Sequence, residues 1–101
     1  MISLIARLRT VDGKAEEFKA AARQQIAAVK ANEAGRTLMY TLQQSQWDSN
    51  QFVVYEQYAD DAALAAHGQT EHMKAFGGKP RGVVEGRPEI ERFDVVAGLG
   101  G

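Results

Sequence analysis

Hydrophobic residues near the start of the chain recur at every second position, which is the period of a β-strand with one buried face. These residues are Ile2, Leu4, Ala6 and Leu8. From residue 14 to residue 32 the apolar spacing changes to steps of three and four, which indicates an amphipathic helix. Its apolar stripe consists of Phe18, Ala22, Ile26 and Val29. Gly35 follows closely, as expected after the end of a helix.

The same criteria predict the rest of the chain. Further strands are expected at residues 37–42, 52–58 and 89–96, helical segments at 62–67 and 71–76 around Gly68, and a loop at 79–88. The order βαββαβ is that of the ferredoxin-like α+β fold. We therefore expect one four-stranded antiparallel sheet with its helices on one face. Residues 1–97 should form this single domain, and residues 98–101 a flexible tail.

Neither face of the predicted strands is cleanly polar. In the third strand Phe52, Val54, Glu56 and Tyr58 share one face, and Val53, Tyr55 and Gln57 share the other; in the second, Leu38, Tyr40 and Leu42 lie opposite Met39, Thr41 and Gln43. An antiparallel sheet with one face in water alternates more strictly. We therefore predict a homodimer packed through the sheet face, against the alternative of a monomer with an apolar outer face.

Composition and charge narrow the classes of function. The 101 residues are 45% hydrophobic and 25% charged, as in an ordinary globular domain. Because 12 Lys and Arg are balanced by 13 Asp and Glu, the chain lacks the basic surface of a general nucleic-acid binder. Without cysteine it has no disulfide, thiol nucleophile or cysteine-ligated metal. We see no apolar run of membrane-spanning length and no signal peptide, so we expect no membrane interaction and a cytoplasmic location.

The two histidines of the chain, His67 and His72, are its only groups that ordinarily titrate near neutral pH. They flank Gly68 where the second helix is expected to end. One interpretation is a general base or a substrate-orienting hydrogen bonder; another is two solvated residues at a helix end. A metal site is disfavoured, because two ligands on one helix face need a spacing of three or four and further ligands would have to come from elsewhere.

Glu56 is a carboxylate within an apolar and aromatic strand. A buried carboxylate is costly unless it is paired, and a histidine, a tyrosine or an arginine would serve as partner. A Glu56–His67 pair would hold the imidazole in one tautomer. The alternative is an edge position that faces solvent. Glu33, at the end of the first helix, has no evident function.

Aromatic side chains on the strands either fill the core or line a binding pocket. Tyr40, Tyr55 and Tyr58 each combine an apolar ring with one hydroxyl group that can orient a substrate. Trp47 lies in the predicted hairpin turn, where an exposed indole suggests a dimer contact or a pocket lid.

Three segments in a fixed order resemble the antibiotic biosynthesis monooxygenase family. The first runs from Phe52 to Asp60, the second from Ala62 to His67 and the third from Thr70 to Met73. Asn32-Glu33-Ala34-Gly35, Tyr40 and Glu89-Ile90 fit the same family, so the resemblance covers nearly the whole chain. It is strongest to the short members that resemble quinol monooxygenases. The interval between Gly35 and Tyr40 is one residue longer than in many members, which predicts a β-bulge.

The resemblance implies a dimeric α+β barrel with one pocket per subunit. Active members of the family oxidise quinol- or anthrone-like aromatics with O₂ and use no metal, haem or flavin as cofactor, so we expect a cofactor-independent monooxygenase of a small quinol-like or polyphenolic aromatic. Under this hypothesis His67 is the base, Glu56 orients it, and His72 and Tyr40 position the substrate. The expected pocket residues are Leu38, Tyr40, Phe52, Tyr58, Met73 and Phe76.

Because relatives with this fold differ in activity, two further functions stay open. One is a proton-shuttling isomerase of a small carbonyl compound, which would use the same residues without O₂. The other is a dimer that binds a ligand without catalysis.

Overall fold

The computed structural model describes the backbone at residues 1–78 and 82–99, and the side chains at residues 1–74 and 82–99. Within these residues the elements are β1 (Ile2–Thr10), α1 (Ala15–Asn32), β2 (Thr37–Gln44), β3 (Gln51–Tyr58), α2 (Asp61–Gly68), α3 (Glu71–Gly78) and β4 (Val84–Asp94). None of the described helices is long and apolar enough to cross a membrane.

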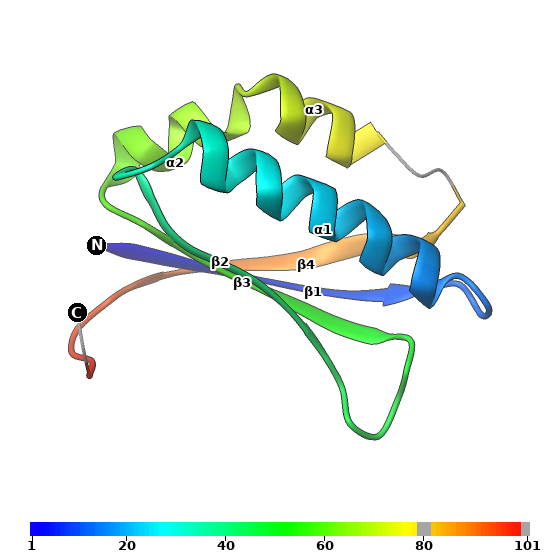
Figure 1. Cartoon of the computed structure of the whole chain (residues 1–101). Helices are drawn as coiled ribbons and strands as arrows, with labels where there is room; N and C mark the ends of the chain where they lie inside the picture. Colours follow the sequence, from blue (N-terminus) through cyan, green and yellow to red (C-terminus); the bar gives the residue numbers. More distant parts are fainter. Residues whose placement is uncertain (79–81, 100–101) are drawn as a thin grey trace.

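The four strands form one antiparallel sheet in the order β2-β3-β1-β4. This is the predicted ferredoxin-like α+β arrangement, which is therefore confirmed. The helices lie on one side of the sheet, while no described helix covers the other side, here called the outer face (Figure 1). Even-numbered residues of the central strands β1 and β3 point toward the helices, because these positions carry the buried side chains.

The core lies between α1 and the middle of the sheet. It is formed by Ala6, Leu8, Phe18, Phe52, Val54 and Val83. At its centre the rings of Phe18 and Phe52 meet edge to face, with centroids 5.1 Å apart. Aromatic rings prefer this geometry because the positive edge of one ring meets the negative face of the other. The core therefore fixes α1 over one part of the sheet, and the polar cluster described below lies beyond it.

A β-bulge interrupts β2 at Leu38. Thr37 pairs with Tyr58 and Met39 pairs with Gln57, so Leu38 is an extra residue in its strand. The bulge predicted before Tyr40 is confirmed. It also makes one expectation wrong, because Leu38 does not share the helix-facing side with Tyr40 and is 47% exposed. Thr37 takes the inward position instead.

The last strand begins earlier than predicted, at Val84 rather than Glu89, and ends at Asp94. Much of the expected loop at residues 79–88 is therefore strand, while residues 79–81 lie outside the described part. The strand tolerates Pro88 because β4 is at the sheet edge, where a missing N–H breaks no ladder hydrogen bond. Gly86 has a φ of 62°, close to a register shift against β1. The predicted start of the strand was therefore too late, because Gly86 and Pro88 are residues that usually interrupt a strand.

Candidate active site

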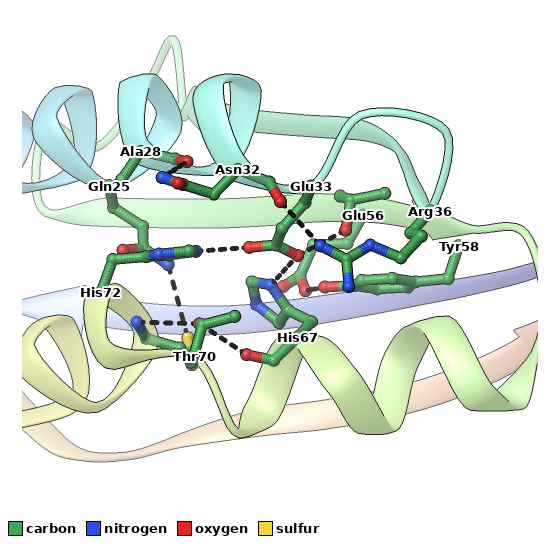
Figure 2. A network of polar contacts seen from close by, with 12 residues as sticks. Gln25, Ala28, Asn32, Glu33, Arg36, Glu56, Tyr58, His67, Thr70 and His72 are labelled. Carbon is green, nitrogen blue, oxygen red and sulfur yellow. Dashed lines mark hydrogen bonds and ion pairs between the residues drawn. The ribbon is translucent and has the colours of Figure 1, made fainter.

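Three polar side chains from separate segments meet beside the core. Glu33, which follows α1, accepts hydrogen bonds from His67 at the end of α2 and from His72 at the start of α3 (Figure 2). The distance from His67 Nδ1 to Glu33 Oε1 is 2.7 Å, and His72 Nε2 contacts Glu33 Oε2. Glu33 and His67 are buried, whereas His72 is partly exposed. The cluster therefore has one side toward solvent, at His72.

A tight turn after α1 places the Glu33 carboxylate. Gly35 has a φ of 79°, a conformation that side chains with a Cβ rarely adopt, and it lets the chain reverse into β2. The Glu33 carbonyl accepts the backbone N–H of Arg36 at 3.1 Å and that of Thr37 at 3.0 Å. Thr37 Oγ1 also donates to Glu33 Oε1 at 2.7 Å. The turn thus directs the Glu33 carboxylate toward His67 of α2 and His72 of α3.

A helix break brings the two histidines to the same carboxylate. His67 ends α2, and after Gly68 the hydroxyl of Thr70 donates to the His67 carbonyl at 2.8 Å and accepts the Met73 N–H at 3.2 Å. Thr70 therefore caps the start of α3. Five residues apart on one helix, the imidazoles would point in different directions. On two helices joined by this corner, their ring centroids are 6.4 Å apart and both rings reach Glu33.

The hydrogen bonds assign the proton of His67. Burial raises the pKa of Glu33, but hydrogen bonds from Thr37, His72 and His67 outweigh it and lower that pKa below its ordinary value of 4.5. Glu33 is therefore ionised and can only accept, so His67 Nδ1 carries the proton. In the tautomer with the proton on Nδ1, the lone pair of the imidazole lies on Nε2. Among the described side chains, this Nε2 is the buried polar atom that has no hydrogen-bond partner.

Two tyrosine rings enclose His67. The ring centroids of Tyr40 and Tyr58 lie 5.5 Å and 5.3 Å from that of His67. Burial, helped by the charge of Glu56, raises the pKa of both phenols above its usual range. Gln25 of α1 partly offsets this rise at Tyr40 through a hydrogen bond. Both phenols are therefore neutral and can donate hydrogen bonds.

Glu56 belongs to a second polar pair, separate from the histidines. It is buried and accepts a hydrogen bond from the hydroxyl group of Tyr58. The alternative of an edge position that faces solvent is therefore wrong. Of the three partners considered, the tyrosine is the one that pairs with Glu56. The expected Glu56–His67 pair is not formed: Glu56 pairs with Tyr58, and His67 pairs with Glu33 through Nδ1. Burial raises the pKa of Glu56 to about 7; the hydrogen bond from Tyr58 opposes this rise and the charge of Glu33 adds to it.

The raised pKa of Glu56 predicts a pH-dependent gain in stability on substitution by glutamine. The folded state holds the Glu56 proton up to about pH 7, whereas the unfolded chain releases it near 4.5. The contribution of the Glu56 proton to folding stability is therefore fully present below pH 4.5 and is lost as the pH rises through 7. The loss corresponds to about 3 kcal/mol at 1.36 kcal/mol per pH unit. Glu56→Gln should be more stable than the parent at pH 8.5, by up to this amount, in urea unfolding.

The control for this prediction is Glu71→Gln, which changes a carboxylate whose side chain is 95% exposed. Its stability should follow that of the parent at every pH. The gain of Glu56→Gln should shrink toward zero at pH 4.5, because glutamine resembles the protonated acid. A difference of equal size at both pH values would contradict the assignment.

The remaining expected pocket residues are dispersed. Met73 lies in α3 near the cluster, where its Sδ accepts a hydrogen bond from Gln25 at 3.5 Å. Phe52 is a core residue packed on Phe18, and Leu38 is the exposed bulge residue. The side chain of Phe76 lies outside the described residues. Of the aromatic candidates whose side chains are described, Tyr40 and Tyr58 are the two with a ring contact to a histidine.

Sequence reasoning did not predict three of the polar residues that lie in this cluster or beside it. They are Gln25, Glu33 and Thr37. Gln25 lies on the buried face of α1 with Phe18, Ala22 and Val29, a position that the helical period assigns to the core but that a polar side chain would suggest is solvated. Glu33 precedes a glycine with positive φ, and only the fold brings it to the histidines. Glu33, His67 and His72 each offer one ligand atom, and these three atoms lie within 4.8 Å of one another, close enough to hold a metal ion.

Comparison with known proteins places the chain in a family. The sequence of residues 1–79 matches the family model of antibiotic biosynthesis monooxygenase. YcnE of Bacillus subtilis (strain 168), named as a candidate monooxygenase, is 27% identical over 95 residues, which cover 94% of this chain and 98% of YcnE.

Solved structures agree with this match. A Caulobacter crescentus CB15 protein, named as a candidate antibiotic biosynthesis monooxygenase, is 38% identical with a TM-score of 0.88, covering 95% of this chain and 90% of its own. PA3566 from Pseudomonas aeruginosa is 32% identical with a TM-score of 0.84, and the coverages are 95% and 94%. The chain therefore belongs to the antibiotic biosynthesis monooxygenase family.

Proposed function

We propose that this protein is a cofactor-independent monooxygenase that oxidises a small quinol-like or polyphenolic aromatic with O₂. The observation that carries the proposal is His67 Nε2, a buried nitrogen with no hydrogen-bond partner among the described side chains, whose ring is held by Glu33 through Nδ1. A lone pair in this position is a general base directed at a ligand rather than at the protein. The neighbouring tyrosine rings supply apolar surface for an aromatic substrate.

The reaction needs no external reductant. His67 Nε2 removes the proton from a substrate hydroxyl group, and the electron-rich anion transfers one electron to O₂. The resulting radical and superoxide combine to form a C–O bond, which gives a hydroperoxide on a carbon that still carries hydrogen. Loss of that hydrogen as a proton breaks the O–O bond and leaves a C=O group. One oxygen atom enters the product and the other leaves as water, so the substrate supplies all four electrons.

The polar groups around His67 have separate roles in this proposal. Glu33 keeps Nδ1 protonated and so keeps Nε2 basic, which is the role that the sequence suggested for Glu56. His72 and Tyr40 position the substrate. Glu56, with a pKa of about 7, can accept or return a proton near neutral pH through its pair with Tyr58.

The outer face of the sheet supports the proposal of a homodimer. Ile5, Val53 and Tyr55 on this face are only half-buried, and Met39 and Phe93 are 41% and 38% exposed. Ile5 pairs directly with Tyr55, and this apolar band across β1 and β3 is bounded by Thr41 of β2 and Glu91 of β4. Burying this band against a second copy removes apolar surface from water.

Light scattering tests the dimer. Two copies of the 11.0 kDa chain should give about 22 kDa at micromolar concentration. Ile5→Asp places a charge in the middle of the apolar band and should shift the mass to that of one chain. Glu17→Lys, on the exposed side of α1, is the matched control and should stay a dimer. A measured mass of 11.0 kDa for the parent protein would contradict the proposed dimer.

Oxygen uptake tests the proposed reaction. Metal-stripped protein is mixed with a panel of hydroquinones and anthrones, and each rate is corrected for autoxidation. The proposal expects enzyme-dependent uptake, a quinone product and incorporation of one atom from ¹⁸O₂. Turnover of a small carbonyl compound under argon would favour the isomerase instead. Ligand binding without turnover in either assay would favour a non-catalytic role.

A further inference from the structure

We propose that Glu33, His67 and His72 also bind a divalent transition-metal ion of the Zn²⁺ class, and that the bound ion switches off the base at His67. The binding half rests on the cluster alone. The inhibition half rests on the proposed function, because it concerns the activity of the same Nε2.

The donor set suits such an ion. Two imidazole nitrogens and one carboxylate are ligands that Zn²⁺ and its neighbours prefer, and three protein ligands leave a position for water. The sequence disfavoured a metal site for two reasons: a spacing of five does not suit one helix face, and further ligands had to come from elsewhere. The helix break at Gly68 removes the first reason, because the two histidines lie on separate helices. The fold supplies a further ligand as Glu33, 34 and 39 residues away in sequence.

The geometry requires small shifts of the three ligand atoms, which lie within 4.8 Å of one another. Tetrahedral zinc with bonds of about 2.0–2.1 Å holds its ligand atoms about 3.3 Å apart. His67 Nδ1 and Glu33 Oε1 are 2.7 Å apart, so they must separate by roughly half an ångström. The partly exposed His72 provides access from solvent. Thr37 Oγ1 already donates to Glu33 at 2.7 Å and would hold a ligating carboxylate in place, as outer-shell partners commonly do.

Metal binding reverses the tautomer of His67. In the metal-free cluster Nδ1 carries the proton, which it donates to Glu33, and Nε2 carries the lone pair. A metal ion needs the Nδ1 lone pair, so the proton of the neutral ring must move to Nε2. Nε2 then donates and can no longer accept a substrate proton. The same movement at His72 exchanges its Nε2 proton for one on Nδ1.

Calorimetry and absorption measure the binding half on the full-length, metal-stripped protein. Titration with ZnCl₂ should show one ion per chain, and CoCl₂ should give the visible absorption of a tetrahedral Co²⁺ site. Loss of an outer-shell partner commonly weakens a metal site by about 10–100-fold, so Thr37→Val should fall in this range and His72→Gln at or beyond its upper end. Glu71→Gln is the matched control and should bind like the parent.

Nitrogen NMR and oxygen uptake measure the switch. Adding Zn²⁺ should move the His67 proton from Nδ1 to Nε2, which the ¹⁵N shifts of the ring report without any substrate. Zn²⁺ should also stop oxygen uptake in the parent, and EDTA should restore it.

Three results would overturn the inference. They are the absence of binding at 100-fold excess Zn²⁺, equal affinity in His72→Gln and the parent, and uptake that rises with the metal. If the metal-free protein oxidises none of the panel, the proposed function fails. Zinc binding and the tautomer shift still decide the metal site in that case.

Discussion

Replacing His67 by alanine is expected to lower kcat for the quinol-like substrate by about 10²–10⁴-fold, the usual contribution of a general base. The reason is that Nε2 is the group placed to take the substrate proton, and no described side chain hydrogen-bonds to it. KM should change much less, because the tyrosine rings that contact the imidazole remain. Steady-state oxygen uptake against substrate concentration separates kcat from KM. Turnover within about twofold of the parent would remove His67 from this role.

Two controls separate chemistry from packing in the His67→Ala variant. Added imidazole should restore part of the lost rate if the missing group is a base. Leu64→Ala removes a half-buried side chain from the same helix and should lower stability while kcat is retained. A lost rate that imidazole cannot restore, together with an equal loss in Leu64→Ala, would indicate a structural effect.

Replacing Glu33 by alanine is expected to destabilise the fold by about 3–5 kcal/mol, because the buried carboxylate has three hydrogen-bonding partners that would lose their acceptor. The partners are Thr37, His67 and His72. Urea unfolding at pH 7 measures the change. The pH dependence of this stability follows from the pKa of Glu33, which is lowered on folding. The contribution of Glu33 to folding stability is present above pH 4.5 and is lost as the pH falls through the pKa of the folded state.

Glu33→Gln tests positioning rather than stability. The amide keeps the shape but no longer requires a proton on His67 Nδ1, so the ring should populate both tautomers in ¹⁵N spectra. Loss of an orienting carboxylate with the wrong tautomer lowers kcat by as much as ~10⁴-fold in hydrolytic triads. We therefore expect a fall in kcat with little change in KM. A purely structural Glu33 would leave the tautomer of the folded protein unchanged.

The two buried carboxylates of the site differ because their surroundings differ. Glu33 accepts three hydrogen bonds, and its pKa falls despite burial. Glu56 accepts one from Tyr58, and burial dominates, so its pKa rises to about 7. An ionised orienting group and a proton-holding group are thus kept close together, which is the pattern expected of acid–base chemistry.

The local pattern of the chain determined the order and type of its elements. A period of two along β1 and β3 and a helical stripe on α1 are set by which side chains face the core, and each can be recognised within a few residues. The Asp60 cap of α2, which accepts the Ala63 N–H at 2.8 Å, is equally local, whereas the bulge at Leu38 was indicated by the resemblance to the family, through the extra residue after Gly35. The histidines were also recognised as the groups suited to proton transfer, because that depends on residue type alone.

Only the tertiary structure decided which polar groups meet. Glu33 looked like a helix end without a function and Glu56 like the natural partner of His67, yet the turn at Gly35 and the break at Gly68 bring Glu33 to both imidazoles. The extent of β4 was also decided this way, because pairing with β1 outweighs the local effects of Gly86 and Pro88. Periodicity reports whether a residue is buried. The partner of a buried charge depends on elements distant in sequence, whose relative placement the packing of the core determines.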